Sequence, residues 1–279
     1  MCAKKTFRRF FRNCVRPHEH TLVQEGVSGL QIAVCVKQVP SAHMGPVMNP
    51  ADVFALEEAL RIRERQGGSV TAVSMGAESA AQILRSCISL GADAGVLLTD
   101  RLFAGGDTLA TATVLSRGLE LLGKPDLILC GTHSTDGETA QVGPALAEKL
   151  GTAHTTHVLE ILALEERHIT CRRMTETGFE IVQLMLPALI TVHKGINQPR
   201  MATINGILKA NRCEITRLSA QDLSLDKQAC GLAGSPTRVQ ATRPAADRQV
   251  PFTVSGKSLR EQIEEIAQLL TDKNMSPGI

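Results

Sequence analysis

The chain contains no tryptophan and no tyrosine, and phenylalanine occurs only seven times in 279 residues. Side chains that stack on the bases of single-stranded nucleic acid are therefore scarce. Charge points the same way, because 30 basic and 28 acidic residues leave a formal net charge of only +2. A nucleic-acid-binding protein normally carries a concentrated basic face. Composition thus argues against nucleic acid as a partner.

Long apolar runs and metal-binding spacings are missing as well. No run approaches the roughly 20 residues that a membrane-spanning helix needs, and the N-terminus lacks the apolar centre of a signal peptide. The eight cysteines are scattered, and none forms a Cys-x-x-Cys pair. We therefore expect reduced, mostly buried thiols in a bacterial cytoplasmic protein, with no bound metal and no membrane span. No Ser/His/Asp or Cys/His arrangement stands out, so no catalytic residue is assigned.

Composition divides the chain into three regions. Residues 1–29 crowd lysine and arginine around phenylalanine, and we expect a disordered tail or a segment absent from the mature protein. A basic amphipathic arm that touches a membrane surface or a partner is the alternative. Residues 30–218 have the regular pattern of an α/β domain. Residues 219–279 begin as a polar stretch and end in a helix with a capping box from Ser258 to Glu261, which predicts an extended arm that packs on a partner chain.

Apolar runs alternate with helix-like segments through the middle region. Four of these runs predict buried strands: 31–36, 69–74, 94–99 and 126–130. This alternation predicts a mostly parallel sheet flanked by helices. Three later runs predict antiparallel strands added to the same sheet: 169–174, 179–185 and 189–192.

The most informative stretch runs from Cys130 to Pro144. It joins a strand-like run to a helix-like one through glycines and small hydroxyl residues. In α/β proteins such a turn leaves backbone N–H groups free to face an anion, and the helix N-terminus adds partial positive charge. The pattern predicts a phosphate site. A tight connection that binds nothing is the alternative.

Seven ordered motifs closely resemble the beta subunit of electron-transfer flavoproteins. They are Val36 to Pro40, Met48 to Pro50, Ser74 to Gly76, Gly91 to Asp93, Asp136 to Pro144, Leu186 to Val192 and Asn197 to Arg200. The resemblance covers roughly residues 31–240. It implies an adenine-nucleotide-binding, Rossmann-like fold and a heterodimer with an alpha subunit that holds its own FAD.

Two kinds of nucleotide occur in this family. Simple members hold AMP as a structural filler, whereas electron-bifurcating members hold a second FAD that takes hydride from NADH. The segments Phe103 to Thr111 and Asp136 to Pro144 resemble the bifurcating branch, with Glu138 as a conservative departure. The resemblance therefore favours FAD, with AMP as the alternative. It implies electron transfer through the alpha-subunit FAD to an acyl-CoA dehydrogenase-type flavoenzyme and to ferredoxin or flavodoxin.

The resemblance also implies which residues meet the nucleotide. They are Cys35, Lys37, Asn49, Met75, Gly76, Asp107, Thr108, Thr111, Gly131, Asp136, Gly137, Thr139, Ala140, Gln141 and Val142. Gly105 and Gly106 would let the backbone approach a planar ring, and Asp107 can cap the following helix. The alternative for this segment is a helix cap followed by a solvated turn. His133, in the phosphate loop, could tune a flavin or be solvated.

Two further points follow from the resemblance. Ile204 takes the place of an apolar side chain that, in the family, docks an acyl-CoA dehydrogenase from an exposed loop; a buried turn residue is its alternative. The segment Ser41 to Met48 is shorter than the usual polar hairpin. A non-redox regulatory protein that binds an adenine nucleotide on a similar sheet remains an alternative of another class.

Overall fold

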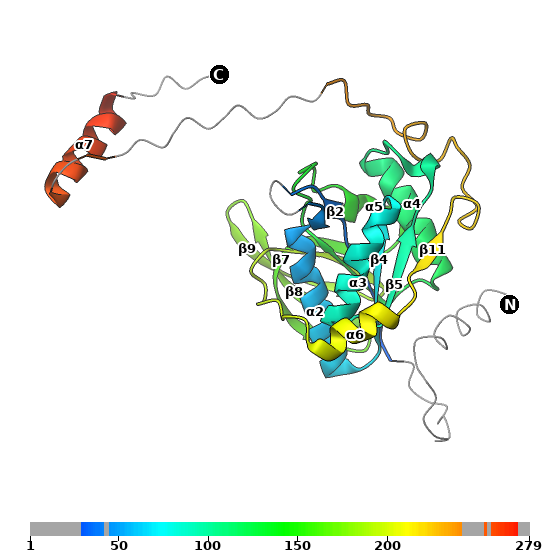
Figure 1. Cartoon of the computed structure of the whole chain (residues 1–279). Coiled ribbons are helices and arrows are strands. Elements are labelled where there is room, and N and C mark those ends of the chain that lie inside the picture. The colour runs from blue at the N-terminus through cyan, green and yellow to red at the C-terminus, as the bar shows by residue number, and fades with distance from the viewer. Residues whose placement is uncertain (1–28, 42–44, 242–253, 256–257, 273–279) are drawn as a thin grey trace. The chain divides into compact units, whose positions relative to one another are not determined.

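The computed structural model describes residues 29–41, 45–241, 254–255 and 258–272 (Figure 1). The chain forms two compact units that divide between Arg238 and Val239. Residues 1–28, for which we expected a disordered or absent tail, lie outside the described residues. None of the described helices is both long and apolar enough to cross a bilayer.

The first unit is built on one sheet of nine strands in the order β11-β5-β4-β1-β6-β10-β7-β8-β9. The strands are β1 (Gln31–Cys35), β4 (Ser69–Met75), β5 (Ala94–Leu98), β6 (Leu127–Gly131), β7 (Ala153–Leu164), β8 (His168–Thr175), β9 (Gly178–Met185), β10 (Ala188–Val192) and β11 (Thr216–Leu218). Every pair from β11 to β7 is parallel, and only β7–β8 and β8–β9 are antiparallel. A separate antiparallel pair joins β2 (Gln38–Val39) to β3 (Val47–Met48). The predicted mostly parallel α/β fold is confirmed.

One strand assignment was wrong. The run 189–192 belongs to β10, which pairs in parallel with both β6 and β7 rather than antiparallel. All five residues of β10 are buried, as in a central parallel strand covered on both faces. The long strand β7, which the pattern did not predict, supplies its outer neighbour. The predicted antiparallel runs 169–174 and 179–185 are correct and form β8 and β9.

Helices cover both faces of the sheet. Helices α2 (Pro50–Gln66), α3 (Ala81–Leu90) and α6 (Ile204–Arg212) contribute to one hydrophobic core. Helices α4 (Thr108–Leu121) and α5 (Val142–Leu150) contribute to the core on the other face. Short 3₁₀ turns η2 (Glu78–Ala80) and η3 (Arg101–Phe103) precede α3 and α4. Helices α2 and α3 end at Gly67 and Gly91, both with positive φ.

The order of the strands fixes where a ligand can bind. From β1 the chain moves through β4 to β5 on one side, and β6 then pairs on the opposite side of β1. Such a reversal opens a crevice at the carboxyl ends of the two strands, where open α/β sheets bind ligands. Here those ends are Cys35 and Gly131.

The end of the first unit lies further along the chain than the expected boundary at 218/219. Ala220, Leu223 and Cys230 are buried in the same core as α4 and α5. These apolar side chains tie the polar stretch to the domain, so the compact unit continues to Arg238. In the second unit, helix α7 (Leu259–Asp272) has the predicted capping box: Ser258 N–H donates to Glu261 Oε2 at 3.2 Å, and Glu261 N–H donates to Ser258 Oγ at 3.3 Å.

Candidate functional site

A buried carboxylate holds the two strand ends of the crevice together. Asp52, in the first turn of α2, is only 5% exposed. Its Oδ2 accepts the Lys37 N–H at 2.7 Å, and its Oδ1 accepts the Gly131 N–H at 3.2 Å. The Asn49 amide donates a third bond to Oδ1 at 2.9 Å. Three segments that lie far apart in sequence thus meet at Asp52, and we call these four residues the Asp52 cluster.

Burial sets the ionisation of this cluster. It raises the pKa of Asp52 from 3.8 to about 7, while the three hydrogen bonds and the nearby Lys37 charge limit the rise. All three partners are donors, so the ionised carboxylate is the form that the local hydrogen bonding satisfies. Gly131 is required here by space. A Cβ at this position would lie 2.4 Å from Asp52 Oδ1 and 2.7 Å from the Cβ of Ala51.

Asn49 extends the cluster into the loop that follows β6. It occupies the N-cap position of α2, but its side chain does not cap the helix. Instead the Asn49 amide donates to the His133 carbonyl at 2.9 Å, and its carbonyl oxygen accepts the Thr135 N–H at 3.2 Å. Asn49 therefore shapes the loop rather than the helix. The His133 side chain is exposed, next to the Thr132 hydroxyl.

Lys37 closes the loop from the other side. Its ammonium donates to Asp136 Oδ1 at 2.8 Å and to the Ser134 hydroxyl at 3.4 Å. Partial burial acts to raise the pKa of Asp136, but the hydrogen bonds from Lys37 and Ser134 and the Lys37 charge lower it overall. We call residues 131–141 loop 131–141. Its first half is held at Gly131 by Asp52 and at Asp136 by Lys37.

The second half of loop 131–141 has the geometry of an anion site. Glu138 and Ala140 adopt positive φ angles of 49° and 54°, and left-handed residues of this kind help to turn neighbouring N–H groups toward one anion. Within the described chain, the backbone N–H groups of Gly137, Thr139 and Ala140 donate to no other residue. Helix α5 follows directly, and the side chain of its N-cap residue Gln141 makes no capping bond. Exposed donors and an uncapped helix N-terminus fit the phosphate groups of a nucleotide.

The start of α4 faces this loop. Asp107 caps α4 as predicted, because its Oδ1 accepts the N–H groups of Leu109 and Ala110, each at 3.0 Å. The Thr108 hydroxyl donates to the Gln141 side-chain carbonyl at 3.3 Å. This bond joins the N-termini of α4 and α5. Thr111 lies one turn further along α4 and is half-buried.

The glycines before α4 contact the chain's own later segment. A methyl group on Gly106 would lie 3.5 Å from the Cα of Gly231, and one on Gly105 would lie 3.5 Å from the Cβ of Leu232. These are ordinary van der Waals distances, so this contact alone does not require glycine at either position. The Leu232 N–H also donates to the Ala104 carbonyl at 3.1 Å.

The remaining residues that we expected at the nucleotide lie at strand ends or pack against the hydrophobic core. Cys35 and Met75 end β1 and β4, and both pack partly against the second core. Gly76 follows β4, and its N–H donates to the Leu98 carbonyl at 3.1 Å. Val142 starts α5 and also packs against this core, so its side chain faces the core. No group of three or more His, Cys, Asp or Glu side chains among the described residues could hold a metal ion.

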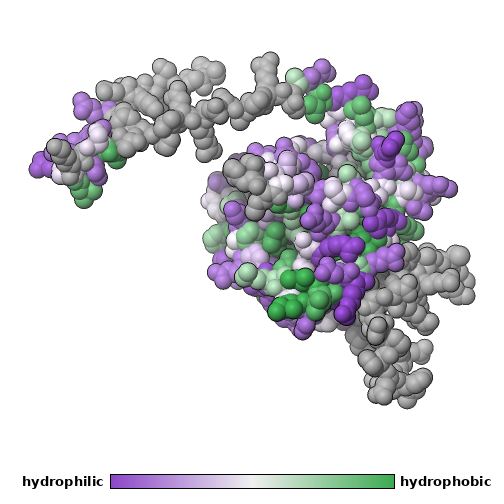
Figure 2. Space-filling model, viewed as in Figure 1, coloured by the Kyte–Doolittle hydropathy of each residue, from purple (hydrophilic) through white to green (hydrophobic). Residues whose placement is uncertain are grey.

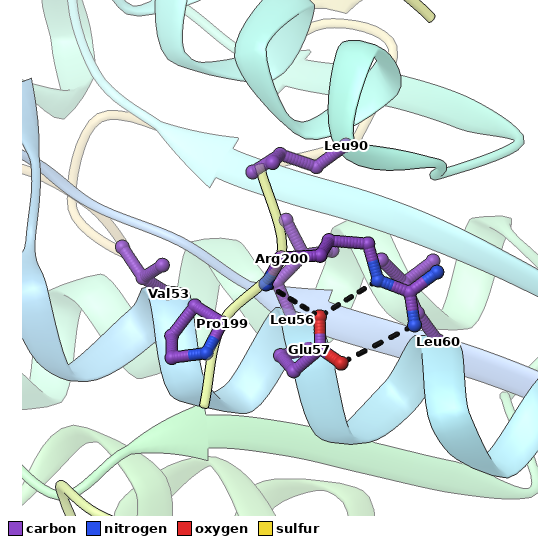
Figure 3. A pocket seen from close by; sticks show the side chains of 7 residues that line it. All are labelled: Val53, Leu56, Glu57, Leu60, Leu90, Pro199 and Arg200. Carbon is purple, nitrogen blue, oxygen red and sulfur yellow. Dashed lines mark hydrogen bonds and ion pairs between the residues drawn. The ribbon is translucent and has the colours of Figure 1, made fainter. Parts of the chain in front are cut away.

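Helix α2 also holds the segment after β10. Arg200 donates to Glu57 Oε2 at 2.8 Å and also pairs with Glu64. Burial acts to raise the pKa of Glu57, but hydrogen bonds from Arg200 and Arg61 lower it overall. Figure 3 shows this ion pair at a small depression with Pro199 beside it. The depression is lined by Val53, Leu56, Glu57, Leu60, Leu90, Pro199 and Arg200, none of which belongs to loop 131–141.

The anchored segment leads into an apolar surface on α6. Ile204 is the first residue of this helix rather than part of a loop, and it is 79% exposed, which excludes the buried alternative. Met201, Ile207 and Leu208 are exposed nearby in the sequence, and Figure 2 shows apolar surface where α6 lies. A Cβ on Gly206 would lie 2.1 Å from the Ser89 carbonyl oxygen, so α6 packs closely on the end of α3.

The structure therefore separates the expected site residues into two places. Those of β1, β6, α4 and loop 131–141 lie at the carboxyl ends of the parallel strands, whereas Ile204 is exposed at the start of α6, whose Gly206 packs on the carboxyl end of α3. Sequence reasoning missed Asp52. The signal was a carboxylate three residues after Asn49 in a helix whose neighbouring positions are apolar, but an acidic residue in a first helical turn is ordinarily assigned to the helix dipole.

Comparison with known proteins identifies the family. Residues 41–223 match the family model for the electron transfer flavoprotein domain. The chain is 38% identical to an electron transfer flavoprotein subunit beta from Thermoanaerobacterium thermosaccharolyticum, across 88% of this chain and 100% of that protein. It is 41% identical to Protein FixA of Azorhizobium caulinodans, across 76% and 83% of the two chains. It is 34% identical to the caffeyl-CoA reductase-Etf complex subunit CarD of Acetobacterium woodii, across 88% and 100%. The chain belongs to the electron transfer flavoprotein family, as a beta subunit.

Proposed function

We propose that this chain binds an adenine nucleotide through loop 131–141 and the N-terminus of α5, as the beta subunit of a heterodimer with an alpha subunit. One observation carries the nucleotide assignment. Among the described residues, the N–H groups of Gly137, Thr139 and Ala140 have no protein acceptor, and the start of α5 that follows them has no side-chain cap. This donor set suits a phosphate chain.

The nucleotide that we propose is FAD, in a heterodimer that oxidises NADH. A bound flavin would supply hydride acceptance and the release of single electrons. This chain would orient the phosphates with loop 131–141, hold that loop with the Asp52 cluster and place Thr108 and Thr111 near the ring. The resemblance of the segments Phe103 to Thr111 and Asp136 to Pro144 to the bifurcating branch supports this choice.

Another observation favours a second candidate, AMP held as a structural filler. Gly231 and Leu232 contact Gly106 and Gly105, the two glycines that we expected to approach a ring. AMP has no isoalloxazine ring and needs no space there. The alternative function is then a simple electron carrier whose redox centre lies in the alpha subunit.

Two contacts with other proteins complete the proposal. The exposed apolar side chains of α7, including Leu259, Ile263 and Ile266, suit a surface on the alpha subunit. The apolar surface around Ile204 suits an acyl-CoA dehydrogenase-type flavoenzyme. Electrons would leave through the alpha-subunit FAD to that enzyme and to ferredoxin or flavodoxin.

Cofactor content tests the proposal directly. The heterodimer is purified, denatured to release its nucleotides, and analysed by chromatography and by its visible spectrum. Two FAD per heterodimer supports the leading proposal, and one FAD with one AMP replaces it by the second. A complex without any nucleotide bound to this subunit would contradict both.

A matched pair of variants then locates the site. At Gly137 a Cβ would meet nothing closer than the Ser134 hydroxyl at 3.6 Å, so Gly137→Leu leaves the protein's own packing intact. We expect it to release the nucleotide, because its side chain projects where the phosphates approach. Gly123→Ala is the control for loss of a glycine outside the loop: nothing lies within 4 Å of it, and although its positive φ makes the substitution strained, the variant should keep the nucleotide.

A further inference from the structure

The segment that ends the first unit is hydrogen-bonded to Asp107, the N-cap residue of α4. We call residues 229–238 the arm root, since the second unit begins at Val239. The Asp107 Oδ2 accepts two bonds from Thr237, from its N–H at 3.0 Å and from its hydroxyl at 2.8 Å. The Asp107 N–H in turn donates to the Ser235 hydroxyl at 2.8 Å. Asp107 thus makes three bonds to the arm root besides its cap on α4.

The fit around this carboxylate is close. The Ser235 hydroxyl donates onward to the Gly231 carbonyl at 2.7 Å, which folds the arm root on itself. Gly231 has a positive φ of 57°, and a Cβ there would lie 1.9 Å from the Leu102 carbonyl oxygen. No other residue could bring the backbone so near η3. Burial acts to raise the pKa of Asp107, but the bonds from Ala110, Thr237 and Leu109 lower it overall. The Asp107 carboxyl is therefore ionised at neutral pH.

Asp107 is also linked to loop 131–141 through the next residue in the chain. Asp107 Oδ1 fixes the first turn of α4, and the next residue, Thr108, donates to Gln141 at the end of loop 131–141. A path therefore runs from Gln141 by a hydrogen bond to Thr108, along the chain to Asp107, and by two hydrogen bonds to Thr237. Because both oxygens of Asp107 are already occupied by protein donors, this residue acts through its neighbours.

We propose that Asp107 is a positioning residue that couples nucleotide binding at loop 131–141 to the order of the arm root. The inference rests on the proposed function in that a nucleotide binds next to Thr108 and Gln141. A nucleotide that orders this end of the loop also orders the first turn of α4 and, through Asp107, the segment that leads to the second unit. By linkage, an ordered arm root strengthens nucleotide binding by the same factor.

Two substitutions break the link from opposite sides. Asp107→Asn keeps an oxygen that can cap α4 but places an amide opposite the donors of Thr237. Thr237→Val leaves Asp107 untouched and removes only the hydroxyl bond. Asp222→Asn is the control, because Asp222 accepts the Ser219 N–H at 2.8 Å in the stretch before the arm root and makes no bond to α4.

Hydrogen exchange read by mass spectrometry tests the coupling. The purified heterodimer is stripped of nucleotide at this subunit and measured with and without added FAD, and with AMP in parallel. In the wild type and in Asp222→Asn we expect nucleotide to slow exchange in residues 231–237 about fivefold or more, within the usual range of coupling between sites. In Asp107→Asn and Thr237→Val the slowing falls below twofold, and the nucleotide Kd rises by a matching factor.

The possible failures can be told apart. If neither FAD nor AMP binds the wild-type subunit, the proposed function is wrong. If nucleotide binds but exchange in residues 231–237 does not change, or changes equally in all four proteins, only the coupling is refuted. The rate of hydrogen exchange within α4 shows whether residue 107 still caps that helix in each variant. Should Asp107→Asn loosen α4, Thr237→Val decides the question, because it retains the cap, and an unchanged nucleotide effect in that variant overturns the proposal.

Discussion

Removing the charge of Asp52 should abolish a large part of the pH dependence of stability. Burial raises the pKa of this carboxyl from 3.8 to about 7. Between those two values the folded protein holds a proton that the unfolded chain has lost. The free energy of unfolding therefore falls as pH rises through this window, and the contribution of Asp52 is greatest below pH 4.

The size of the effect follows from the shift. A change from 3.8 to about 7 corresponds to about 4 kcal/mol across the whole window, at about 1.4 kcal/mol for each pKa unit. Between pH 8 and pH 5 the wild type should gain ~2.5 kcal/mol from this group alone. Asp52→Asn has no such titration. Its amide still meets the donors at Lys37 and Gly131, so its stability at any single pH combines lost hydrogen bonds with the relief of a buried charge.

The slope with pH is the decisive measurement. Urea unfolding of the wild type and of Asp52→Asn at pH 5, 6, 7 and 8 gives two curves, and their difference removes the contribution of all other groups. Asp222→Asn is a matched control, since Asp222 also accepts a backbone hydrogen bond, from Ser219 at 2.8 Å, but lies at the surface, where the bonds from Ser219 lower its pKa. Its curve should run parallel to that of the wild type. Parallel curves for the wild type and Asp52→Asn would refute the reasoning.

Three further changes test other parts of the structure. Gly131→Ala places a Cβ 2.4 Å from Asp52 Oδ1, so we expect a loss of ~2 kcal/mol in urea unfolding and weaker nucleotide retention after gel filtration. Ile204→Asp should slow electron transfer to the dehydrogenase at least tenfold in stopped-flow assays without loss of nucleotide, while Ile204→Leu remains near wild type; equal rates would remove α6 from docking. Ending the chain after Arg238 should leave the first unit folded but weaken alpha-subunit association, as measured by analytical ultracentrifugation, whereas ending it after Leu218 removes buried core residues and should also lower the melting temperature.

The parts of the fold that local pattern could predict are those with local causes. Strands β1, β5 and β6 are almost wholly apolar, β4 carries apolar residues between Ser and Thr, and glycines follow the helices α2 and α3 where the backbone takes a positive φ. The orientation of β10 has no local cause. A buried apolar strand looks the same whether its neighbours run parallel or antiparallel, and the choice depends on β7, whose polar and apolar residues do not alternate cleanly.

The candidate site divides in the same way. Loop 131–141 and the cap at Asp107 could be predicted because turn residues and helix caps are encoded within a few positions. The Asp52 cluster and the arm root could not, since each joins segments separated by more than seventy residues. Asp52 resembles an ordinary first-turn carboxylate until β6 is placed beside it. Thr237 resembles a linker residue until Gly231 brings the chain against η3.

Helix α2 also makes two properties of the protein independently adjustable. It has 17 residues and so spans about 25 Å. Its first turn supports loop 131–141 through Asp52, and its later turns hold Arg200 ahead of α6. A helix of this length keeps the proposed nucleotide end and the proposed docking end from sharing side chains. If both proposals hold, substitutions around Ile204 can change which enzyme is bound without altering the nucleotide site.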